Sequence, residues 1–155
     1  STATLIASAE ELTALLSSIQ TFTTFYLDLE ETNLCRHGTI SLITILPHPQ
    51  GVVRVIDVLT LGRSAFTTTS QDGKSLKSIF EDPAIQKCLW DTRKDADALW
   101  AHYQVRLAGV IDIQLLENAS RSASKKYLCG LEKAIKLDLK LGAAKRNRWL
   151  RYKEE

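Results

Sequence analysis

Apolar residues along the chain recur at two spacings, and each spacing predicts a different kind of element. Apolar residues three or four positions apart predict helices, whereas short apolar or β-branched runs bounded by turn residues predict strands. The helical spacing occurs over residues 9–19, 74–80, 94–103, 113–119, 127–141 and 143–152. Strands are predicted over residues 22–29, 40–46, 52–58, 86–90 and 109–112.

The order of these elements predicts the fold class. The first three strands are joined by connections too short for crossovers, so they are expected to form an antiparallel meander in which Pro47 and Pro49 end the second strand. After a Thr- and Ser-rich segment, 64–73, which we expect to be a loop, strands alternate with helices as in parallel β-α-β units. We therefore predict an α/β fold with a mixed central sheet and helices on both faces. No repeat or linker is evident, so residues 1–155 are expected to form a single domain.

Composition limits the class of protein. A hydrophobic content of 45% and a charged content of 25% are ordinary for a soluble domain, and no apolar run approaches the roughly 18 residues that span a bilayer. Residues 1–10 lack a signal peptide, and because the chain begins without Met we expect an excised domain. Three widely spaced cysteines without zinc-ligand spacing indicate reduced thiols, which predicts an intracellular protein, nuclear or cytoplasmic.

Charge is unevenly distributed along the chain. Residues 121–155 hold 11 Lys or Arg and 4 Asp or Glu, a net charge of +7, whereas residues 1–120 hold 9 and 14, a net charge of −5. An acidic body with a basic end suits a metal site beside an anionic polymer. A solvated basic helix explains the basic end equally well.

The tripeptide Asp28-Leu29-Glu30 ends the first predicted strand. Because side chains alternate along a strand, Asp28 and Glu30 are expected to project from the same face. Two neighbouring carboxylates repel each other unless a cation lies between them, and Mg²⁺ or Mn²⁺ prefers oxygen ligands. The alternative is an exposed strand end with two solvated acids.

A second acidic candidate, Asp95, lies in the first turn of the helix that follows the strand 86–90. Asp95 and Leu99 are four residues apart and share a helix face. If Leu99 packs on the sheet, Asp95 points to the edge where Asp28 and Glu30 are expected. The alternative is an Asp that only stabilises the helix N-terminus.

Further acids and the tryptophans are also candidates for contacts with a metal or with nucleic acid. Asp97 is expected to be solvated, Asp91 is a weak substitute for Asp95, and Asp112 is interpreted as a helix cap or a group behind the metal ligands. Three tryptophans, Trp90, Trp100 and Trp149, could stack on bases. Trp90 is more typical of a core strand, and Trp149 in the basic end is the better candidate.

Taken together, residues 26–45 and Asp95 resemble the first two motifs of the DEDD-superfamily 3′-5′ exonucleases, in particular the ribonuclease D-like and Werner-type enzymes. The first motif is an apolar strand, Asp-x-Glu, a polar turn and a second apolar strand, and Asp95 falls where the second motif has its Asp. Residues 110–117 and 127–135 are similar to the family's next strand-to-helix step and following helix. The resemblance covers roughly residues 10–153.

The resemblance implies a ribonuclease H-like fold and hydrolysis of phosphodiesters from the 3′ end of single-stranded RNA or DNA. By resemblance, Asp28, Glu30 and Asp95 are catalytic ligands of two divalent cations, Mg²⁺ or Mn²⁺, and Leu29 lies beside the terminal nucleotide. Arg93 and Lys94 are candidates for phosphate contacts, although they could equally be solvated residues at a helix start. No membrane association is implied, and protein partners would bind regions outside this chain.

One departure affects the activity that the resemblance implies. The family has a third motif, a Tyr or His followed four residues later by Asp, whereas Tyr103 is followed by Leu107 and Tyr127 by Leu131. The chain is therefore expected to be truncated before that motif or to lack the fourth carboxylate. The alternative function is a catalytically inactive domain of the same fold that binds nucleic acid or a protein partner. A purely structural protein-interaction domain is a third possibility, against which the basic end argues mildly.

Overall fold

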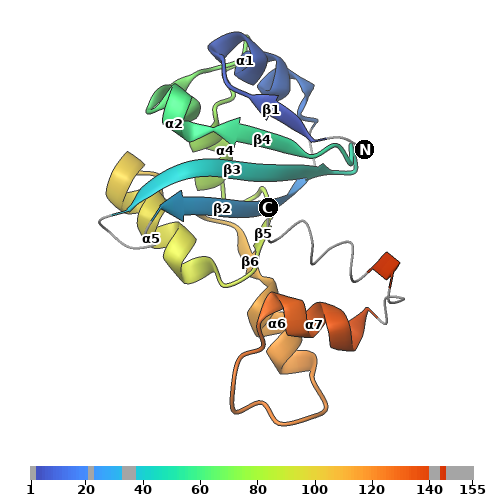
Figure 1. Cartoon of the computed structure of the whole chain (residues 1–155). Helices are drawn as coiled ribbons and strands as arrows, with labels where there is room; N and C mark the ends of the chain where they lie inside the picture. The colour runs from blue at the N-terminus through green and yellow to red at the C-terminus, as the bar shows by residue number, and fades with distance from the viewer. Residues whose placement is uncertain (1–2, 21–22, 33–37, 140–143, 146–155) are drawn as a thin grey trace. The chain divides into compact units, whose positions relative to one another are not determined.

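The computed structural model describes residues 3–20, 23–32, 38–139 and 144–145 (Figure 1). The chain divides into two compact units, residues 1–112 and 113–155, which are described separately. Within the described ranges, no helix combines the length and the apolar character needed to cross a membrane.

The first unit contains a six-stranded sheet in the order β1-β4-β3-β2-β5-β6. Strands β2, β3 and β4 form the predicted antiparallel meander, whereas β1 pairs with β4, β5 with β2 and β6 with β5 in parallel. The mixed sheet and the α/β class are thus confirmed. The strands are β1 (Thr4–Ile6), β2 (Thr24–Thr32), β3 (Thr39–His48), β4 (Arg54–Asp57), β5 (Lys87–Leu89) and β6 (Val110–Asp112).

Five helices accompany these strands among the described residues of this unit. They are α1 (Ala9–Ser18), α2 (Val58–Leu61), α3 (Ser64–Thr67), α4 (Leu76–Glu81) and α5 (Thr92–Tyr103). Helix α1 begins with a capping box in which the Ser8 hydroxyl accepts a hydrogen bond from the Glu11 amide and the Glu11 carboxylate accepts from the Ser8 amide. The prediction of a loop over residues 64–73 was wrong at its start, because α3 forms there, and β1 was not predicted.

Alternation along β2 separates the core from the polar face of the strand. Phe25, Leu27 and Leu29 are buried and join one hydrophobic core with side chains of β3, α1, α3, α4 and α5, whereas Asp28 and Glu30 are exposed. A slip of one residue in the pairing of β2 would place both carboxylates in the core, so burial on one face fixes the register.

Strand β3 runs through Pro47, contrary to the prediction that this proline ends the strand. Pro47 lies opposite Phe25, and the Phe25 amide donates to the Gln86 carbonyl, away from Pro47. In an antiparallel ladder, the two residues of a non-hydrogen-bonded pair direct their amides away from each other. On that outer side the pairing with β4 ends at Ile45, so the amide that Pro47 lacks would have no strand partner.

Lys87 on β5 is completely buried, and its ammonium group is held by the backbone at the end of α4. The Lys87 Nζ donates to the Ile79 carbonyl at 2.9 Å and to the Asp82 carbonyl at 2.6 Å. Burial lowers the pKa of Lys87 to about 8, against a smaller opposing effect of the Asp82 charge. The two carbonyls satisfy a charge that would otherwise be costly to bury.

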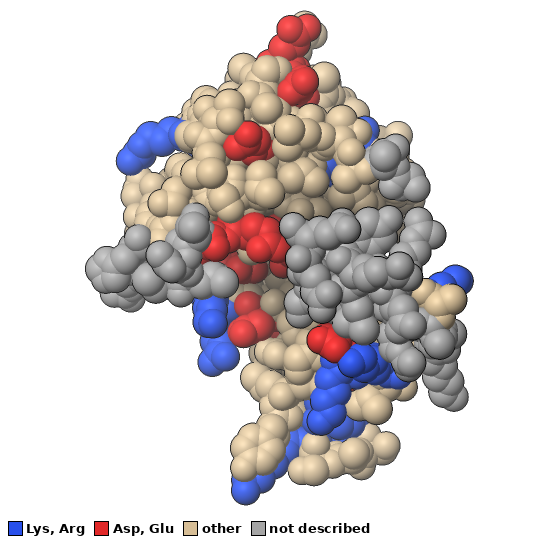
Figure 2. Space-filling model, viewed as in Figure 1, with Lys and Arg blue, Asp and Glu red and all other residues tan. Residues whose placement is uncertain are grey.

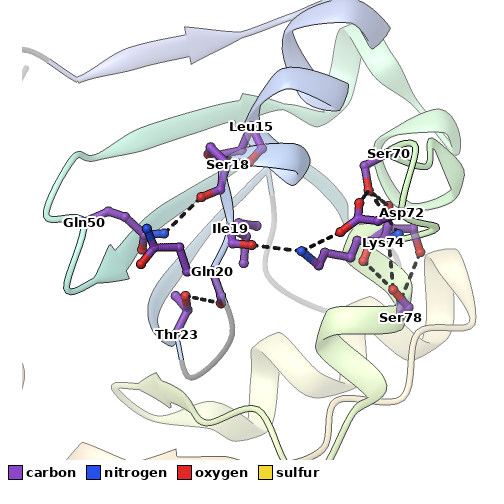
Figure 3. Close-up of polar contacts among 11 residues, drawn as sticks. Leu15, Ser18, Ile19, Gln20, Thr23, Gln50, Ser70, Asp72, Lys74 and Ser78 are labelled. Atoms are coloured by element: carbon purple, nitrogen blue, oxygen red, sulfur yellow. Dashed lines mark hydrogen bonds and ion pairs between the residues drawn. The ribbon is translucent and has the colours of Figure 1, made fainter.

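A second lysine fastens the loop before α4 to the end of α1 (Figure 3). The Lys74 Nζ donates to the Ile19 carbonyl at 2.9 Å and forms an ion pair with Asp72 at 2.7 Å. The Ser70 hydroxyl accepts a hydrogen bond from the Lys74 amide and donates to Asp72. This network holds the loop in place at the opposite end of β2 from its two carboxylates.

The second unit contains helices α6 (Ile113–Ser120) and α7 (Leu131–Asp138). Helix α7 begins later than the predicted residue 127, because Gly130 has the extended backbone of an N-cap residue. The Gln114 side-chain amide donates a hydrogen bond to the Cys129 carbonyl at 2.9 Å. Cys129, and Cys88 of the first unit, are buried free thiols, as expected. Residues 144 and 145 are helical, but the rest of the predicted helix 143–152, with Trp149, lies outside the described residues, as does Cys35.

Candidate active site

Strand β2 positions the first two candidate ligands at its carboxyl end. Asp28 and Glu30 project from the face opposite the core, as the alternation predicted. The pairing with β3 shifts register between Glu30 and Glu31, and the Ser41 hydroxyl donates to the Glu30 carbonyl at 2.8 Å. Glu30 pairs with Leu42 and Glu31 with Ile40, so the extra residue, Ser41, lies on β3 and the alternation of β2 continues through Glu31.

The start of α5 brings the third candidate ligand to the same edge of the sheet. Strand β5 is parallel to β2, so the helix that follows it begins at the carboxyl end of both strands. Asp91 precedes the helix with a left-handed backbone, φ 58° and ψ 70°, and its side chain makes no cap hydrogen bond. Instead the Asp112 carboxylate, from the end of β6, accepts from the Thr92 amide at 3.0 Å. Asp112 is therefore a helix cap, as predicted, and the capped helix is α5.

Asp95 is the most perturbed carboxyl group in the described residues of this unit. Its side chain is buried, with 8% of the residue exposed, and burial together with the negative charges of Asp28, Glu31, Asp91 and Glu30 raises its pKa to about 7. Within the described part of the chain, no hydrogen bond or ion pair reaches the Asp95 carboxylate. Burial also raises the pKa of Asp28. The structure thus brings the three predicted residues, Asp28, Glu30 and Asp95, within electrostatic reach of one another.

Glu31 is a member of this cluster that the sequence analysis missed. Both of its carboxylate oxygens are buried without a hydrogen-bond partner, and burial raises its pKa against a smaller opposing effect of His102. The Nε2 atom of His102, seven residues after Asp95 on α5, is also buried without a partner. The continuing alternation of β2 was a usable signal, since Glu31 lies two residues after the buried Leu29 and therefore faces the same side.

These carboxylates suit a divalent cation chemically. Figure 2 shows Asp and Glu side chains gathered together on the visible face of the first unit. The donors are carboxylate oxygens, which hard cations prefer, and a cation would offset both the burial and the neighbouring negative charges that raise the pKa of Asp95 to about 7. No three His, Cys, Asp or Glu side chains in the described ranges are arranged to hold one ion together. The role of Asp28, Glu30 and Asp95 as metal ligands stays a prediction.

The three residues predicted to contact nucleic acid occupy different environments. Leu29 belongs to the hydrophobic core and is 5% exposed, so the structure gives it a packing role. Arg93 and Lys94 are exposed in the first turn of α5, and the Arg93 Nε lies 3.4 Å from the Asp91 carboxylate. Contacts of these three residues with a substrate stay predictions.

The chain resembles known exonucleases in sequence and in fold. The sequence profile described as 3′-5′ exonuclease matches residues 4–147. Trypanosoma brucei RNase D in complex with the RNA U12 is 30% identical over 76% of this chain, with a TM-score of 0.65, and the complex of the same enzyme with GMP is 26% identical over 96%, with a TM-score of 0.75. Escherichia coli RNase D is 20% identical over 88% of the chain with a TM-score of 0.64, which supports the fold alone. No match was found among curated proteins.

The chain spans less than half the length of these RNase D structures. It covers 39% and 46% of the two T. brucei RNase D chains and 33% of the E. coli RNase D chain. The fold and the family therefore follow from the comparisons, whereas the activity of a whole protein does not.

Proposed function

Because the chain belongs to the 3′-5′ exonucleases of the DEDD superfamily, we propose that it carries the acidic part of an active site that hydrolyses phosphodiesters from a 3′ end. The observation that carries this proposal is the buried carboxyl of Asp95, which has no hydrogen-bond partner in the described residues and lies within reach of the charges of Asp28 and Glu30. A buried carboxyl group with a strongly raised pKa, at the carboxyl end of a sheet, is typical of a functional site.

In this proposal Asp28, Glu30 and Asp95 hold two divalent cations, Mg²⁺ or Mn²⁺. When bound, two such ions supply an acidified water and stabilise the leaving 3′ oxygen of the scissile phosphate. The three carboxylates are held at one edge by β2 and by the first turn of α5, whose position is set by the cap from Asp112. Arg93 and Lys94, exposed beside Asp95, would contact phosphates, and Leu29 would support the terminal nucleotide from the core.

The proposed substrate is the 3′ end of a single-stranded nucleic acid, RNA or DNA. The RNase D structure with the RNA U12 supports RNA, but the 2′-hydroxyl contact that separates the two requires no motif visible in this chain. Partners beyond the substrate would bind regions outside residues 1–155.

Cation binding tests the site directly. Titration calorimetry with Mn²⁺ should give binding to the parent chain and a loss of at least about tenfold in affinity for Asp28→Asn and for Asp95→Asn. The exposed neighbour Asp97 provides a matched control, since Asp97→Asn removes one carboxylate from the same helix without removing a proposed ligand. Equal affinity in all four proteins would refute the assignment of these residues as ligands.

A second candidate function is a non-catalytic nucleic-acid-binding scaffold. The observation that favours it is that, in this sequence, no Tyr or His is followed four residues later by Asp, the pattern of the third motif. We expect cleavage by this chain to be about 10²–10⁴-fold slower than cleavage by a chain extended at the C-terminus through such a motif. Equal metal-dependent rates for the two chains would show that the third motif is dispensable, and no cleavage by either would favour the scaffold.

A further inference from the structure

A hollow of about 420 Å³ lies at the far end of α5 from Asp95. It is lined by residues from the end of α5, from α4 and from the segment that leads into β6, namely Lys77, Glu81, Trp100, Gln104, Arg106 and Ala108. Trp100 is 49% exposed, an unusual position for a large aromatic side chain. We call this hollow the Trp100 pocket.

The polar side chains of the Trp100 pocket are held in place by contacts with one another. The Lys77 Nζ donates to the Gln104 carbonyl at 2.5 Å and lies 3.1 Å from the Glu81 carboxylate. The Arg106 amide donates to the same carboxylate at 3.0 Å, and Arg63 donates to the Gln104 side chain at 3.4 Å. The lining thus holds two cationic side chains, Lys77 and Arg106, and one carboxylate, Glu81, so it carries a net positive charge.

The aromatic ring and a cation are already stacked. The Arg106 guanidinium carbon lies 5.1 Å from the centroid of the Trp100 ring, within the range of a cation–π contact. An indole flanked by a guanidinium group offers a stacking surface for a base and a donor for the adjoining phosphate. Half of the Trp100 surface stays accessible for such a contact.

We propose that the Trp100 pocket binds a nucleotide of a single-stranded nucleic acid, several nucleotides upstream of the 3′ end at the carboxylate cluster. The proposal rests on the proposed function for the position of the 3′ end, and on the positive charge and the exposed indole for the nature of the ligand. Helix α5 has 12 residues and is therefore about 18 Å long, with Asp95 in its first turn and the pocket beyond Trp100. A strand of several nucleotides spans such a distance, and single-strand binding domains commonly cover about 4–16 nucleotides.

Equilibrium binding of short and long single strands tests this proposal. Fluorescence anisotropy would be measured in Mg²⁺ with 5′-labelled, hydrolysis-resistant phosphorothioate strands of three and of twelve nucleotides, so that the 3′ end can bind at the carboxylate cluster without being cleaved. Trp100→Ala should weaken binding of the 12-mer about tenfold and leave the 3-mer unchanged, and Trp100→Phe should bind the 12-mer nearly as well as the parent. Arg106→Ala should reduce the salt dependence of 12-mer binding by about one phosphate contact. Leu59→Ala, which removes an exposed apolar side chain of α2, is the matched control and should change neither affinity.

Two results would overturn the proposal. An unchanged 12-mer affinity in both Trp100→Ala and Arg106→Ala would leave the pocket to a protein partner. An equal loss for the 3-mer and the 12-mer, or a loss that Trp100→Phe does not rescue, would show that Trp100 acts through folding alone. Failure of this proposal and failure of the proposed function are distinguishable, since a chain that binds the 12-mer through Trp100 but never cleaves with Mg²⁺ would refute catalysis and retain the pocket.

Discussion

Lys87 and Asp95 are ionisable side chains buried in the same unit, and their surroundings differ in one respect. The Lys87 ammonium group donates to two carbonyls at the end of α4, whereas no hydrogen bond or ion pair from the described residues reaches the Asp95 carboxylate. Around Asp95 lie four further acids, and around Lys87 lie backbone oxygens. The backbone thus satisfies the Lys87 ammonium group, whereas no described group satisfies the Asp95 carboxylate.

This difference is the one expected between a structural charge, Lys87, and a charge that we propose to be functional, Asp95. A buried charge that is fully hydrogen-bonded favours one specific packing arrangement. A buried charge among like charges instead lowers the stability of the folded chain when no cation is bound. The contributions of Lys87 and Asp95 to the free energy of unfolding should therefore change in opposite directions with substitution and with pH.

The largest expected effect is on catalysis. In a chain that contains the third motif, Asp95→Asn should reduce metal-dependent cleavage of a single strand by at least about 10²–10⁴-fold, because the amide cannot replace a carboxylate ligand. The rate would be measured by gel from single-turnover reactions, with circular dichroism to verify the fold. Asp97→Asn should cleave at the parent rate, and a comparable loss in both variants would remove the distinction between the two acids.

The next effect is a dependence of stability on pH and cation. The pKa of Asp95 is raised from 3.8 to about 7, so between these values the folded chain binds more protons than the unfolded chain and loses stability as pH rises. Urea denaturation without divalent ions should give a free energy of unfolding that falls from pH 4 to pH 7, and Mg²⁺ should restore stability more at pH 7.5 than at pH 5. In Asp95→Asn both changes should shrink, and identical profiles for parent and variant would assign them to other groups.

A smaller effect is expected at Lys87. Lys87→Met should lower the free energy of unfolding by about 1–3 kcal/mol, because the carbonyls of Ile79 and Asp82 lose their donor. The pKa of Lys87 is lowered from 10.5 to about 8, so its contribution to stability should rise as pH increases between these values, and Lys87→Met should abolish that rise. Cleavage per folded molecule should not change, and a loss of activity would show that Lys87 is more than a structural charge.

The smallest effect is expected at Glu31. Its buried carboxylate oxygens have no partner, so Glu31→Gln should raise the metal-free free energy of unfolding at pH 7.5 by about 1 kcal/mol or less. Denaturation with urea at pH 7.5 measures the change. A destabilised variant would instead indicate that the attraction between Glu31 and His102 outweighs the cost of burial.

Much of the fold could be predicted because the spacing of apolar residues is local. The helix that begins at Ala9 and the meander from β2 to β4 follow from such spacing, and the core face of β2 follows from alternation. The passage of β3 through Pro47 could not be predicted, because it depends on where the pairing of β4 ends. Likewise β1 has only three residues, too few for a period to be visible.

The candidate site, like the fold, could be predicted only in part. Asp28 and Glu30 could be placed on one face from their spacing, and Asp95 could be placed near them from its position after a strand. The start of α5 at Thr92 could not, because it depends on Asp112, twenty residues away. Such contacts between distant segments leave no periodic signal in the sequence.

The cap from Asp112 links the site to the chain beyond it. Asp112 is the last residue of the first unit, and α6 begins at the next residue, Ile113. Asp112 pairs with Leu89 in the β5–β6 ladder, and its carboxylate accepts from the Thr92 amide, one turn before Asp95. The position of Asp95 therefore depends on the pairing of an edge strand that supplies none of the proposed ligands.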